Sequence, residues 1–472
     1  MRSNRTGPAS ARDADFGDKS KALGCKVKRT ADFHRNREAG SSREFLAELD
    51  GTGEVAHIRR EVSPRYEIAA VASKLDGKPL LFEKVKGSEY RVAAGVCGTR
   101  GALARSIDIG PVSLLPRIQD SIEHPKEFRV AHDAPCQEII EDEVDLSEIP
   151  ILTHCELDGG PYVTAGIAVA HDGQYGYNAS FHRLMVIGKD RVAARILPRH
   201  LDEFIKRGNR EVGIALGNHP AFLFASAVSC EIGKSELAIA NSLKEMSFVK
   251  CTTNGSMVPA DCELVLEGVV TDELVDEGPF PDIIGSYDIV RKQRVIKVER
   301  VTHRKDPIYQ AILPGGVEHR FLMGTPREAT MFREVSKVCE CIDVRLTAGG
   351  SSWLHAVVKI RKRRQDDADD AIEAAFRGHG SLKQVVVVDE DIDIEDPNAV
   401  EWAIATRTQF DSDLKLRPGE LGSSLDPSAD QMTRKTCKVG IDATIPLDSP
   451  KERFLKSRIP GENEVRLEEY LG

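Results

Sequence analysis

The sequence predicts a mixed α/β (α+β) protein built from two or three domains. A chain of 472 residues is too long for one ordinary hydrophobic core. Helix-like and strand-like patterns alternate near both ends of the chain, whereas residues 135–320 consist of short β-rich runs separated by turn residues. We therefore expect an N-terminal α/β segment, a central β-barrel or curled sheet, and a C-terminal α/β region.

The N-terminal part begins with a segment that has no structural pattern. Residues 1–42 are polar and show no hydrophobic period, which predicts a disordered tail. A helix is expected to begin at Ser41 or Ser42, because either hydroxyl can cap the amphipathic segment that follows. Beyond that helix, the pattern predicts a strand, a helix and a strand at residues 57–62, 66–74 and 80–82.

The central part is predicted to be mostly strand, with one helix at residues 235–246. The strands expected there are 162–169, 183–187, 192–196, 212–216 and 262–270. In the C-terminal part, four consecutive valines at 385–388 predict a buried strand of a parallel sheet. Residues 412–436 are expected to be rich in loops.

Composition excludes several classes of function. The net charge of −10 gives no reason to expect nucleic acid or an anionic membrane as a partner. No apolar run reaches the ~20 residues that a membrane-spanning helix requires, and the first residues lack the apolar core of a secretory signal. The ten cysteines form no CxxC pair, which is typical of reduced thiols. These features predict a cytoplasmic protein.

The segment Glu277-Gly278-Pro279-Phe280-Pro281-Asp282 carries two carboxylates on a short stretch of chain. Its two prolines exclude a regular helix or a central strand, so a turn or an irregular loop is expected. There, two neighbouring carboxylates and one arginine can produce one ionised group and one proton donor. The alternative is a solvated acidic loop, because further acidic residues precede Glu277 at positions 272, 273 and 276.

A second polar segment, Asn178-Ala179-Ser180-Phe181-His182-Arg183, lies about a hundred residues earlier. The planar guanidinium of Arg183 can hold Glu277 or a substrate carboxylate, although a lone arginine is more often a surface or ion-pair residue. Asn178, His200 and Glu236 together can bind Mn²⁺ or Mg²⁺. The alternative is a helix-capping Glu236 and an exposed His200.

These residues give the chain a resemblance to the UbiD family, decarboxylases that use prenylated FMN. Glu277-Gly278-Pro279-Phe280 is similar to the glutamate-glycine-proline-phenylalanine element of that family, and residues 178–183 are similar to its asparagine-to-arginine strand. Further similar segments follow in order from about residue 42 to 445: 45–46, 81–83, 158–164, 258–260, 264–268, 388–393, 402–407, 425–427 and 440–444.

The resemblance implies a domain organisation and a set of partners. The domains expected are a disordered tail at 1–42, an N-terminal α/β domain at 43–130, a prenylated-FMN-binding split β-barrel domain at 131–322 and a C-terminal α/β oligomerisation domain at 323–472. It also implies a homodimer or larger homo-oligomer, and a separate flavin prenyltransferase that supplies the cofactor.

The resemblance also implies roles for individual residues. Arg183, Glu277 and Asp282 would form a catalytic triad, and Asn178, His200 and Glu236 would bind Mn²⁺ or Mg²⁺. A potassium ion would lie near Ala225, Val228 and Glu236. The residues implied to contact the cofactor are Asn178, Ser180, Phe181, His182, Arg183, Arg199, His200, Ser226, Glu236 and Lys438, with Lys435 as the alternative to Lys438.

The function implied is reversible, non-oxidative decarboxylation of an aromatic or heteroaromatic acid, with Asp282 as the proton donor. Asp282 and Pro281 stand where the family commonly has glutamate and glycine, which suggests a differently shaped pocket. If the substrate were a dicarboxylate, an extra cation would be needed, and the candidates are Arg291, Lys292 and Arg304. The alternatives are an FMN reductase or oxidoreductase on a similar barrel, an inactive flavin-binding paralogue and, within the family, a polyprenyl-hydroxybenzoate decarboxylase.

Overall fold

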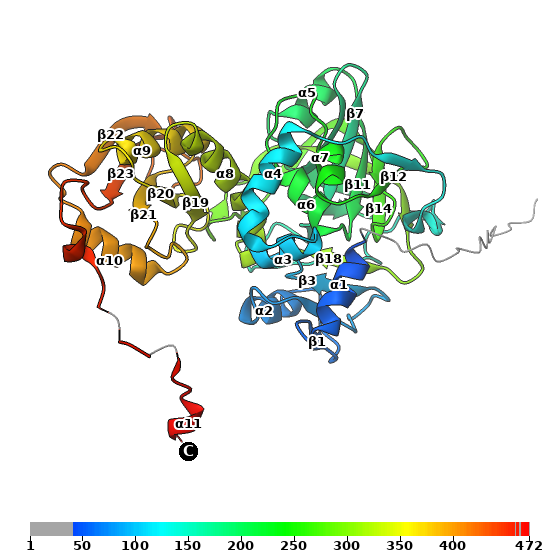
Figure 1. The fold of residues 1–472 in the computed structure, drawn as a ribbon. Helices are drawn as coiled ribbons and strands as arrows, with labels where there is room; N and C mark the ends of the chain where they lie inside the picture. The colour runs from blue at the N-terminus through cyan, green and yellow to red at the C-terminus, as the bar shows by residue number, and fades with distance from the viewer. Residues whose placement is uncertain (1–40, 458, 462–463, 472) are drawn as a thin grey trace, which may run out of the picture. The chain divides into compact units, whose positions relative to one another are not determined.

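The computed structural model describes residues 41–472 except 458, 462–463 and 472 (Figure 1). The tail predicted at 1–42 therefore lies almost wholly outside the described residues. Helices α1 to α11 and strands β1 to β23, arranged in several sheets, confirm the predicted mixed α/β class. Within the part of the chain that is described, no helix is both long and apolar enough to cross a membrane.

The N-terminal sheet has the order β1-β2-β3-β18, and its last strand comes from a distant part of the chain. β18 pairs in parallel with β3, and the two lie side by side in Figure 1. The strands are β1 (Ala56–Ile58), β2 (Leu80–Phe82), β3 (Arg91–Ala94) and β18 (Ile308–Ala311), and the helices are α1 (Ser42–Gly51), α2 (Glu67–Lys74), α3 (Arg100–Ser106) and α4 (Leu114–Glu123). α1 begins as predicted, because Ser41 Oγ accepts a hydrogen bond from Glu44 N.

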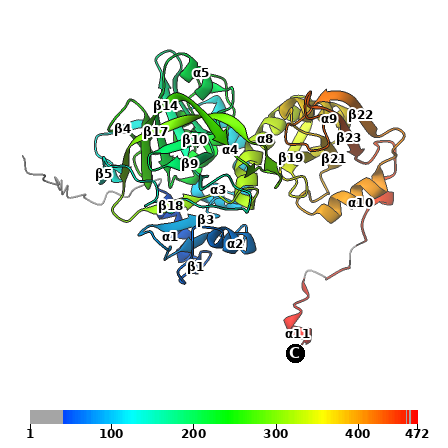
Figure 2. The same cartoon turned by 180° about the vertical axis from the view of Figure 1, so that it is seen from behind.

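The central sheet contains nine strands, and every pairing within it is antiparallel (Figure 2). Its order is β6-β9-β10-β17-β14-β11-β7-β8, with β5 paired to β17. The strands are β5 (Ile139–Glu141), β6 (Tyr162–Val163), β7 (Ile167–Asp172), β8 (Gly176–Phe181), β9 (Leu184–Gly188), β10 (Arg191–Ala194), β11 (Glu211–Leu216), β14 (Leu264–Glu277) and β17 (Arg291–His303). The central domain is thus built around one nine-stranded antiparallel sheet.

The acidic run before Glu277 is a strand, so the alternative of a solvated acidic loop is wrong. β14 continues through the run, and β17 opposite it is basic. Asp276 pairs with Lys292 at 3.0 Å, and Asp272 pairs with Arg294 at 3.1 Å. Opposite charges on facing strands stabilise such a pairing, so the acidic residues extend the strand beyond the predicted end at 270.

The central part holds more helix than predicted. Besides α7 (Glu236–Leu243), which shortens the predicted helix 235–246, it contains α5 (His200–Lys206) and α6 (Pro220–Ala227). α6 has no polar face, because nearly all its residues are buried, and a helix that is apolar all round lacks the period that sequence analysis detects. The remaining strands here are β4 (Arg129–Ala131), β12 (Ser247–Lys250), β13 (Met257–Pro259), β15 (Phe280–Pro281) and β16 (Tyr287–Asp288).

The C-terminal sheet has the order β19-β20-β21-β23-β22, and the valines 385–388 are fully buried in its middle strand. β21 is parallel to both neighbours, as predicted. The segment 412–436 is not only loop, because β22 lies in it. The elements are α8 (Val317–Ser336), β19 (Glu340–Leu346), β20 (His355–Arg361), α9 (Asp367–Gly378), β21 (Gln384–Asp389), α10 (Pro397–Arg407), β22 (Leu414–Leu421), β23 (Lys435–Ala443) and α11 (Glu468–Leu471), and short 3-10 helices span Pro111–Ser113, Pro135–Gln137 and Lys451–Phe454.

A buried arginine connects α3 to the start of this C-terminal region. Arg100 donates to Glu328 Oε2 on α8 at 2.7 Å and to Asp343 Oδ1 on β19 at 2.9 Å. Only 9% of the Arg100 side chain is exposed, and 4% of that of Glu328. A buried pair of this kind is costly to break, because removal of one partner leaves an uncompensated charge.

We expect Arg100→Met to lower the free energy of unfolding by about 3 kcal/mol, measured by urea denaturation. Glu328 would keep the hydrogen bond from Leu346 N, but its nearest remaining cation among the described residues would be Arg345 at 3.9 Å. Arg60→Met is the matched control, because Arg60 is 86% exposed and its nearest carboxylate is 3.8 Å away. Equal unfolding midpoints for the two variants would contradict the role assigned to Arg100.

Candidate active site

The centre of the site is an ion pair between Arg183 and Glu277. Arg183 lies in the turn between β8 and β9, directly before β9, and Glu277 is the last residue of β14. Arg183 Nε lies 2.8 Å from Oε1 of Glu277 and Nη2 lies 2.9 Å from Oε2, so the guanidinium holds the carboxylate with two parallel hydrogen bonds. The Glu277 side chain is fully buried. Burial opposes the charge of Arg183, but its bonds to Glu277 prevail and raise the pKa of Arg183.

Two residues that sequence analysis missed complete this pair. Tyr162 Oη donates to Glu277 Oε1 at 3.1 Å, and burial together with the Glu277 carboxylate raises the pKa of Tyr162. Asp288 accepts from Arg183 Nη2 at 3.1 Å and from Arg291 Nη2 at 2.9 Å. Nothing local in the sequence indicates these contacts, because they depend on the pairing of β6 with β9 and of β15 with β16.

The turn after Glu277 packs against Gly159, and any other residue at this position would displace the backbone of the turn. A Cβ on Gly159 would lie 2.3 Å from the carbonyl oxygen of Gly278, and Gly159 N donates to Pro279 O at 2.9 Å. The Gly278–Pro279 peptide is cis, and Gly278 has φ +102°. Gly278 and Pro279 thus form a turn between β14 and β15, consistent with the expectation drawn from the two prolines.

Phe280 covers the ion pair. Its ring centroid lies 4.1 Å from that of Tyr162 and 5.5 Å from Cζ of Arg183. His154 meets the same ring edge-on at 6.0 Å. Because Phe280 is itself buried, this packing keeps water away from the Arg183–Glu277 pair.

Asp282 lies just beyond β15 and is held by backbone groups instead of arginine. Its Oδ1 accepts from Ile283 N at 2.6 Å, whereas Arg183 donates to Glu277 and Asp288. His319, at the start of α8, lies close enough for the charge of Asp282 to act on it, but burial prevails and lowers the pKa of His319. His319 Nδ1 accepts from Gly315 N at 2.9 Å, so the neutral ring carries its proton on Nε2.

The structure also brings Asn178, His200 and Glu236 together, although they come from three separate elements. Asn178 Nδ2 lies 3.2 Å from both carboxylate oxygens of Glu236, and His200 Nδ1 lies 4.0 Å from Oε1. Cys230, which sequence analysis did not assign, donates to Oε1 at 3.2 Å. Glu236 is only 2% exposed, and burial raises its pKa to about 7. The alternative of a simple helix-capping glutamate is therefore wrong.

This donor set suits a hard divalent cation. Glu236 supplies carboxylate oxygens, His200 a ring nitrogen and Asn178 an amide whose oxygen and nitrogen can exchange places. Across residues 41–472 as described, no group of three or more His, Cys, Asp or Glu side chains is arranged to hold a metal, so this site depends on the Asn178 amide. Nearby on α6, Ser226 Oγ is buried without a hydrogen-bond partner, which is consistent with a ligand that supplies one.

The other residues expected near the cofactor are mostly close to this cluster. Ser180 and Phe181 lie on β8 with Asn178. His182 Nδ1 donates to Arg195 O at 3.0 Å and Nε2 accepts from Ser180 Oγ at 3.0 Å, and burial lowers the pKa of His182, so the ring is neutral. Ala225 and Val228 lie at the end of α6, which packs against α7.

Lys438 is placed apart from this cluster. It lies on β23, donates to Gly380 O at 2.6 Å and sits 5.4 Å from the ring of Phe376, all within the C-terminal region. Lys435 is exposed at the start of the same strand. Neither lysine contacts the Asn178–Arg183 strand in the contacts that the described residues make.

The extra cations considered for a dicarboxylate are already engaged. Arg291 pairs with Asp288 at 2.9 Å and Lys292 with Asp276 at 3.0 Å. Arg304 is buried and donates to Cys262 O and Asp261 O. All three residues therefore already have partners within the fold.

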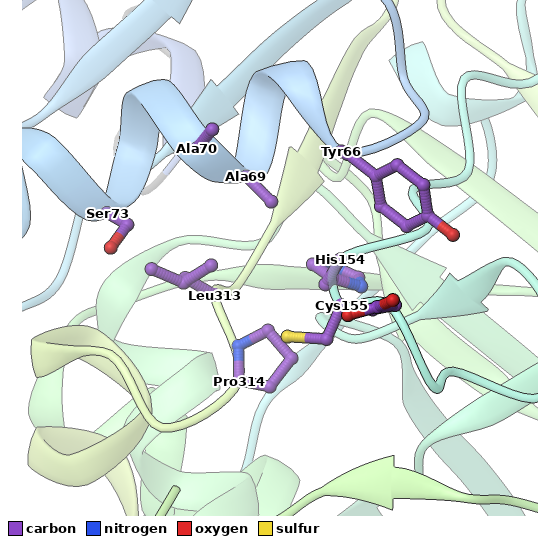
Figure 3. Close-up of a pocket in the computed structure, with 9 residues that line it drawn as sticks. Tyr66, Ala69, Ala70, Ser73, His154, Cys155, Leu313 and Pro314 are labelled. Atoms are coloured by element: carbon purple, nitrogen blue, oxygen red, sulfur yellow. The ribbon is translucent and has the colours of Figure 1, made fainter.

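A cavity of about 650 Å³ borders the segment that leads into α8 (Figure 3). Figure 3 shows α2 contributing one wall, with the Cys155 side chain pointing toward Pro314 on the other. Both ring nitrogens of His154 are buried there without hydrogen-bond partners. The lining residues are Tyr66, Ala69, Ala70, Ser73, His154, Cys155, Glu156, Leu313 and Pro314, so the cavity adjoins Phe280 through His154 but does not include Arg183, Glu277 or Asp282.

Several named proteins are similar to the chain over most of its length. Five relatives named anhydromevalonate phosphate decarboxylase are 37–44% identical over 84–89% of this chain and 92–99% of their own. The one from Methanosarcina mazei is 44% identical over 89% of this chain and 99% of its own. The one from Methanothermobacter thermautotrophicus is 41% identical over 86% and 97%.

Solved structures resemble the fold closely. The UbiD-class enzyme HmfF from Pelotomaculum thermopropionicum in complex with FMN is 40% identical, with a TM-score of 0.88 over 91% of this chain and 100% of that one. An evolved dimeric form of HmfF in complex with prenylated FMN is 38% identical, with a TM-score of 0.84 over 92% and 100%. Vanillic acid decarboxylase from Sedimentibacter hydroxybenzoicus in open form is 27% identical, with a TM-score of 0.80 over 92% and 98%.

Family models match three consecutive parts of the chain. They describe the N-terminal, the Rift-related and the C-terminal domains of 3-octaprenyl-4-hydroxybenzoate carboxy-lyase, and they match residues 46–122, 129–317 and 320–443. With the coverage and identity of the relatives, these matches show that the chain belongs to the UbiD family of prenylated-FMN-dependent decarboxylases.

Proposed function

We propose that this member of the family decarboxylates a phosphorylated acid, anhydromevalonate phosphate. The observation that carries the proposal is the set of relatives with that name, which match this chain at up to 44% identity and almost to their full length. This substrate replaces the expected aromatic or heteroaromatic acid. None of these relatives has a name that includes such an acid.

An aromatic acid remains the second candidate. It is favoured by the structural similarity to vanillic acid decarboxylase, although at 27% identity this similarity is weaker than that to the anhydromevalonate phosphate decarboxylases. The polyprenyl-hydroxybenzoate named in the family models describes the family as a whole. Family membership argues against the FMN reductase alternative.

The geometry supports a division of labour between the two carboxylates. Glu277 accepts two hydrogen bonds from Arg183 and one from Tyr162, so its oxygens are occupied and it is suited to orienting Arg183. Asp282 is half-buried and has no bond to Arg183, so it is the group available to deliver a proton to the carbon that loses CO₂. When bound, prenylated FMN supplies an electron sink for that carbon.

The residues around Glu236 are proposed to hold the cofactor's phosphate end through a divalent cation. Asn178, His200 and Glu236 would bind Mn²⁺ or Mg²⁺, and a potassium ion would lie near Ala225 and Val228. The residues that would line the flavin are Ser180, Phe181, His182, Arg183, Arg199 and Ser226. Lys438 would have to exchange its bond to Gly380 O for the phosphate.

The partners proposed are those that the cofactor and the family imply. A flavin prenyltransferase would supply prenylated FMN. The active form is proposed to be a homodimer or a larger homo-oligomer, in line with the dimeric form of HmfF among the similar structures.

Asp282→Asn is expected to lower kcat by about 100-fold or more, because it removes the proposed proton donor. Release of CO₂ from anhydromevalonate phosphate would be measured with enzyme co-expressed with a flavin prenyltransferase. Asp276→Asn is the control, because Asp276 is exposed and pairs with Lys292 on the surface. Asp282→Asn enzyme that binds the flavin and turns over at the normal rate would exclude Asp282 as the proton donor.

Glu236→Gln is expected to release most of the flavin on desalting, because it halves the carboxylate oxygens available to the proposed cation and removes a charge that the site is built around. Flavin absorbance per protein would be compared before and after desalting, with and without a chelator. Glu231→Gln, on an exposed residue in the loop that precedes α7, is the control. Equal flavin retention in both variants would refute the proposed metal site.

Wild-type enzyme loaded with prenylated FMN is expected to decarboxylate anhydromevalonate phosphate in preference to vanillic acid. The products would be identified by NMR, and enzyme carrying plain FMN is the control. Turnover of vanillic acid alone would overturn the proposed substrate in favour of the aromatic alternative. Reduction of plain FMN by NADPH, without CO₂ release from either acid, would support the oxidoreductase alternative.

A further inference from the structure

Helix α8 places two arginines on one edge that faces away from its buried side. Arg320 and Arg327 are seven residues apart, so they lie on the same face, about 10 Å from one another along the axis. Both are partly buried, and Met323 lies between them on that face. His319, in the first turn of the helix, lies close enough to Asp282 for its charge to act on the ring, so this edge leads away from the proposed proton donor.

Arg327 is held by neutral groups only. Its Nη2 donates to Ser229 Oγ at 2.7 Å, and its Cζ lies 5.9 Å from the ring of Trp353. Burial, with the charge of Arg199, lowers the pKa of Arg327 to about 10. No carboxylate within the described part of the chain lies within ion-pair distance of Arg327. By contrast, the buried Arg407 pairs with Asp389 and Asp391.

A second arginine lies close enough for its charge to act on Arg327. Arg199 is exposed, precedes α5 directly, and has no ion-pair partner among residues 41–472 as described. Its charge acts on Arg327 and on His182 and His200, so Arg199 lies near all three residues. Two guanidinium groups with like charge repel one another, and an anion between them would remove that repulsion.

We propose that Arg327 and the Ser229 hydroxyl form a subsite for the phosphate group of the substrate, with Arg199 on its flavin side. The inference rests on the proposed function, whose substrate carries its phosphate away from the carboxylate that reacts. A guanidinium binds phosphate oxygens with two parallel hydrogen bonds, which a partly buried position strengthens. Eight residues of α8, about 12 Å along the axis, separate His319 from Arg327. The arginine side chain and a short phosphorylated acid together bridge that distance.

The flavin phosphate is the other source of the same chemistry. The substrate is favoured because Arg327 shares α8 with His319, which lies beside Asp282, whereas the residues proposed to hold the flavin phosphate gather around Glu236. The two sources give different results when Arg327 is changed. Loss of the substrate subsite changes KM, whereas loss of a cofactor subsite changes flavin retention.

The test compares anhydromevalonate phosphate with unphosphorylated anhydromevalonate on enzyme loaded with prenylated FMN. Arg327→Gln is expected to raise KM for the phosphorylated acid by about 100-fold, with a smaller change in kcat, and to leave kcat/KM for the unphosphorylated acid unchanged. Arg327→Lys keeps the charge, so its KM for the phosphorylated acid should lie between that of wild type and that of Arg327→Gln. Arg333→Gln, on the same helix but paired with Glu334, is the control and should match wild type.

Isothermal titration of the loaded enzyme with inorganic phosphate gives a readout that does not depend on turnover. Phosphate should bind wild type and the Arg333→Gln control but not Arg327→Gln. Equal phosphate binding by wild type and Arg327→Gln would overturn the inference, as would release of the flavin from Arg327→Gln on desalting. Phosphate binding by wild type that turns over no phosphorylated acid would refute the proposed function and leave the subsite supported.

Discussion

The fully buried carboxylate of Glu277 is the constraint on which the rest of the site depends. A charge without access to water requires a counter-ion and satisfied oxygens, and Arg183 and Tyr162 provide both. To supply them, the turn between β8 and β9 must reach the end of β14, which the antiparallel central sheet achieves through β10, β17 and β6. Three further residues enclose this ion pair. Phe280 packs over it, Asp288 accepts a hydrogen bond from Arg183, and Gly159 leaves room for the turn after Glu277.

Much of the fold could be predicted from local pattern, and the failures share a physical cause. The capped start of α1 and the buried parallel strand at 385–388 depend only on residues close in the sequence, and both predictions are confirmed. Helix α6 has no polar face, so it gives no period. The acidic run of β14 leaves an exposed loop open as an alternative, because the basic residues that stabilise it as a strand belong to β17.

The residues of the site likewise fall into those that local sequence motifs predict and those that only the fold brings together. Sequence motifs pointed to Arg183, Glu277, Asn178 and Glu236, and the fold brings them into two adjoining pairs. Convergence of Asn178, His200 and Glu236 could not be deduced from spacing, because three separate elements supply them. Tyr162, Asp288, Cys230 and Arg327 were missed, since each acquires its significance from strand register or helix packing. Lys438 shows the opposite case, a motif residue that the fold leaves within the C-terminal region.

The N-terminal sheet is completed by a strand from residues 308–311. During synthesis, more than 200 residues must therefore be added after β3 before its parallel partner β18 leaves the ribosome. Over that interval its open edge can pair with other chains, as unpaired edge strands do. In a shortened chain that ends before β18, the edge of β3 would stay unpaired permanently. Production of the enzyme in pieces, or fusion at a site upstream of residue 308, would thus favour aggregation, whereas chaperone binding to the nascent N-terminal part would suppress it.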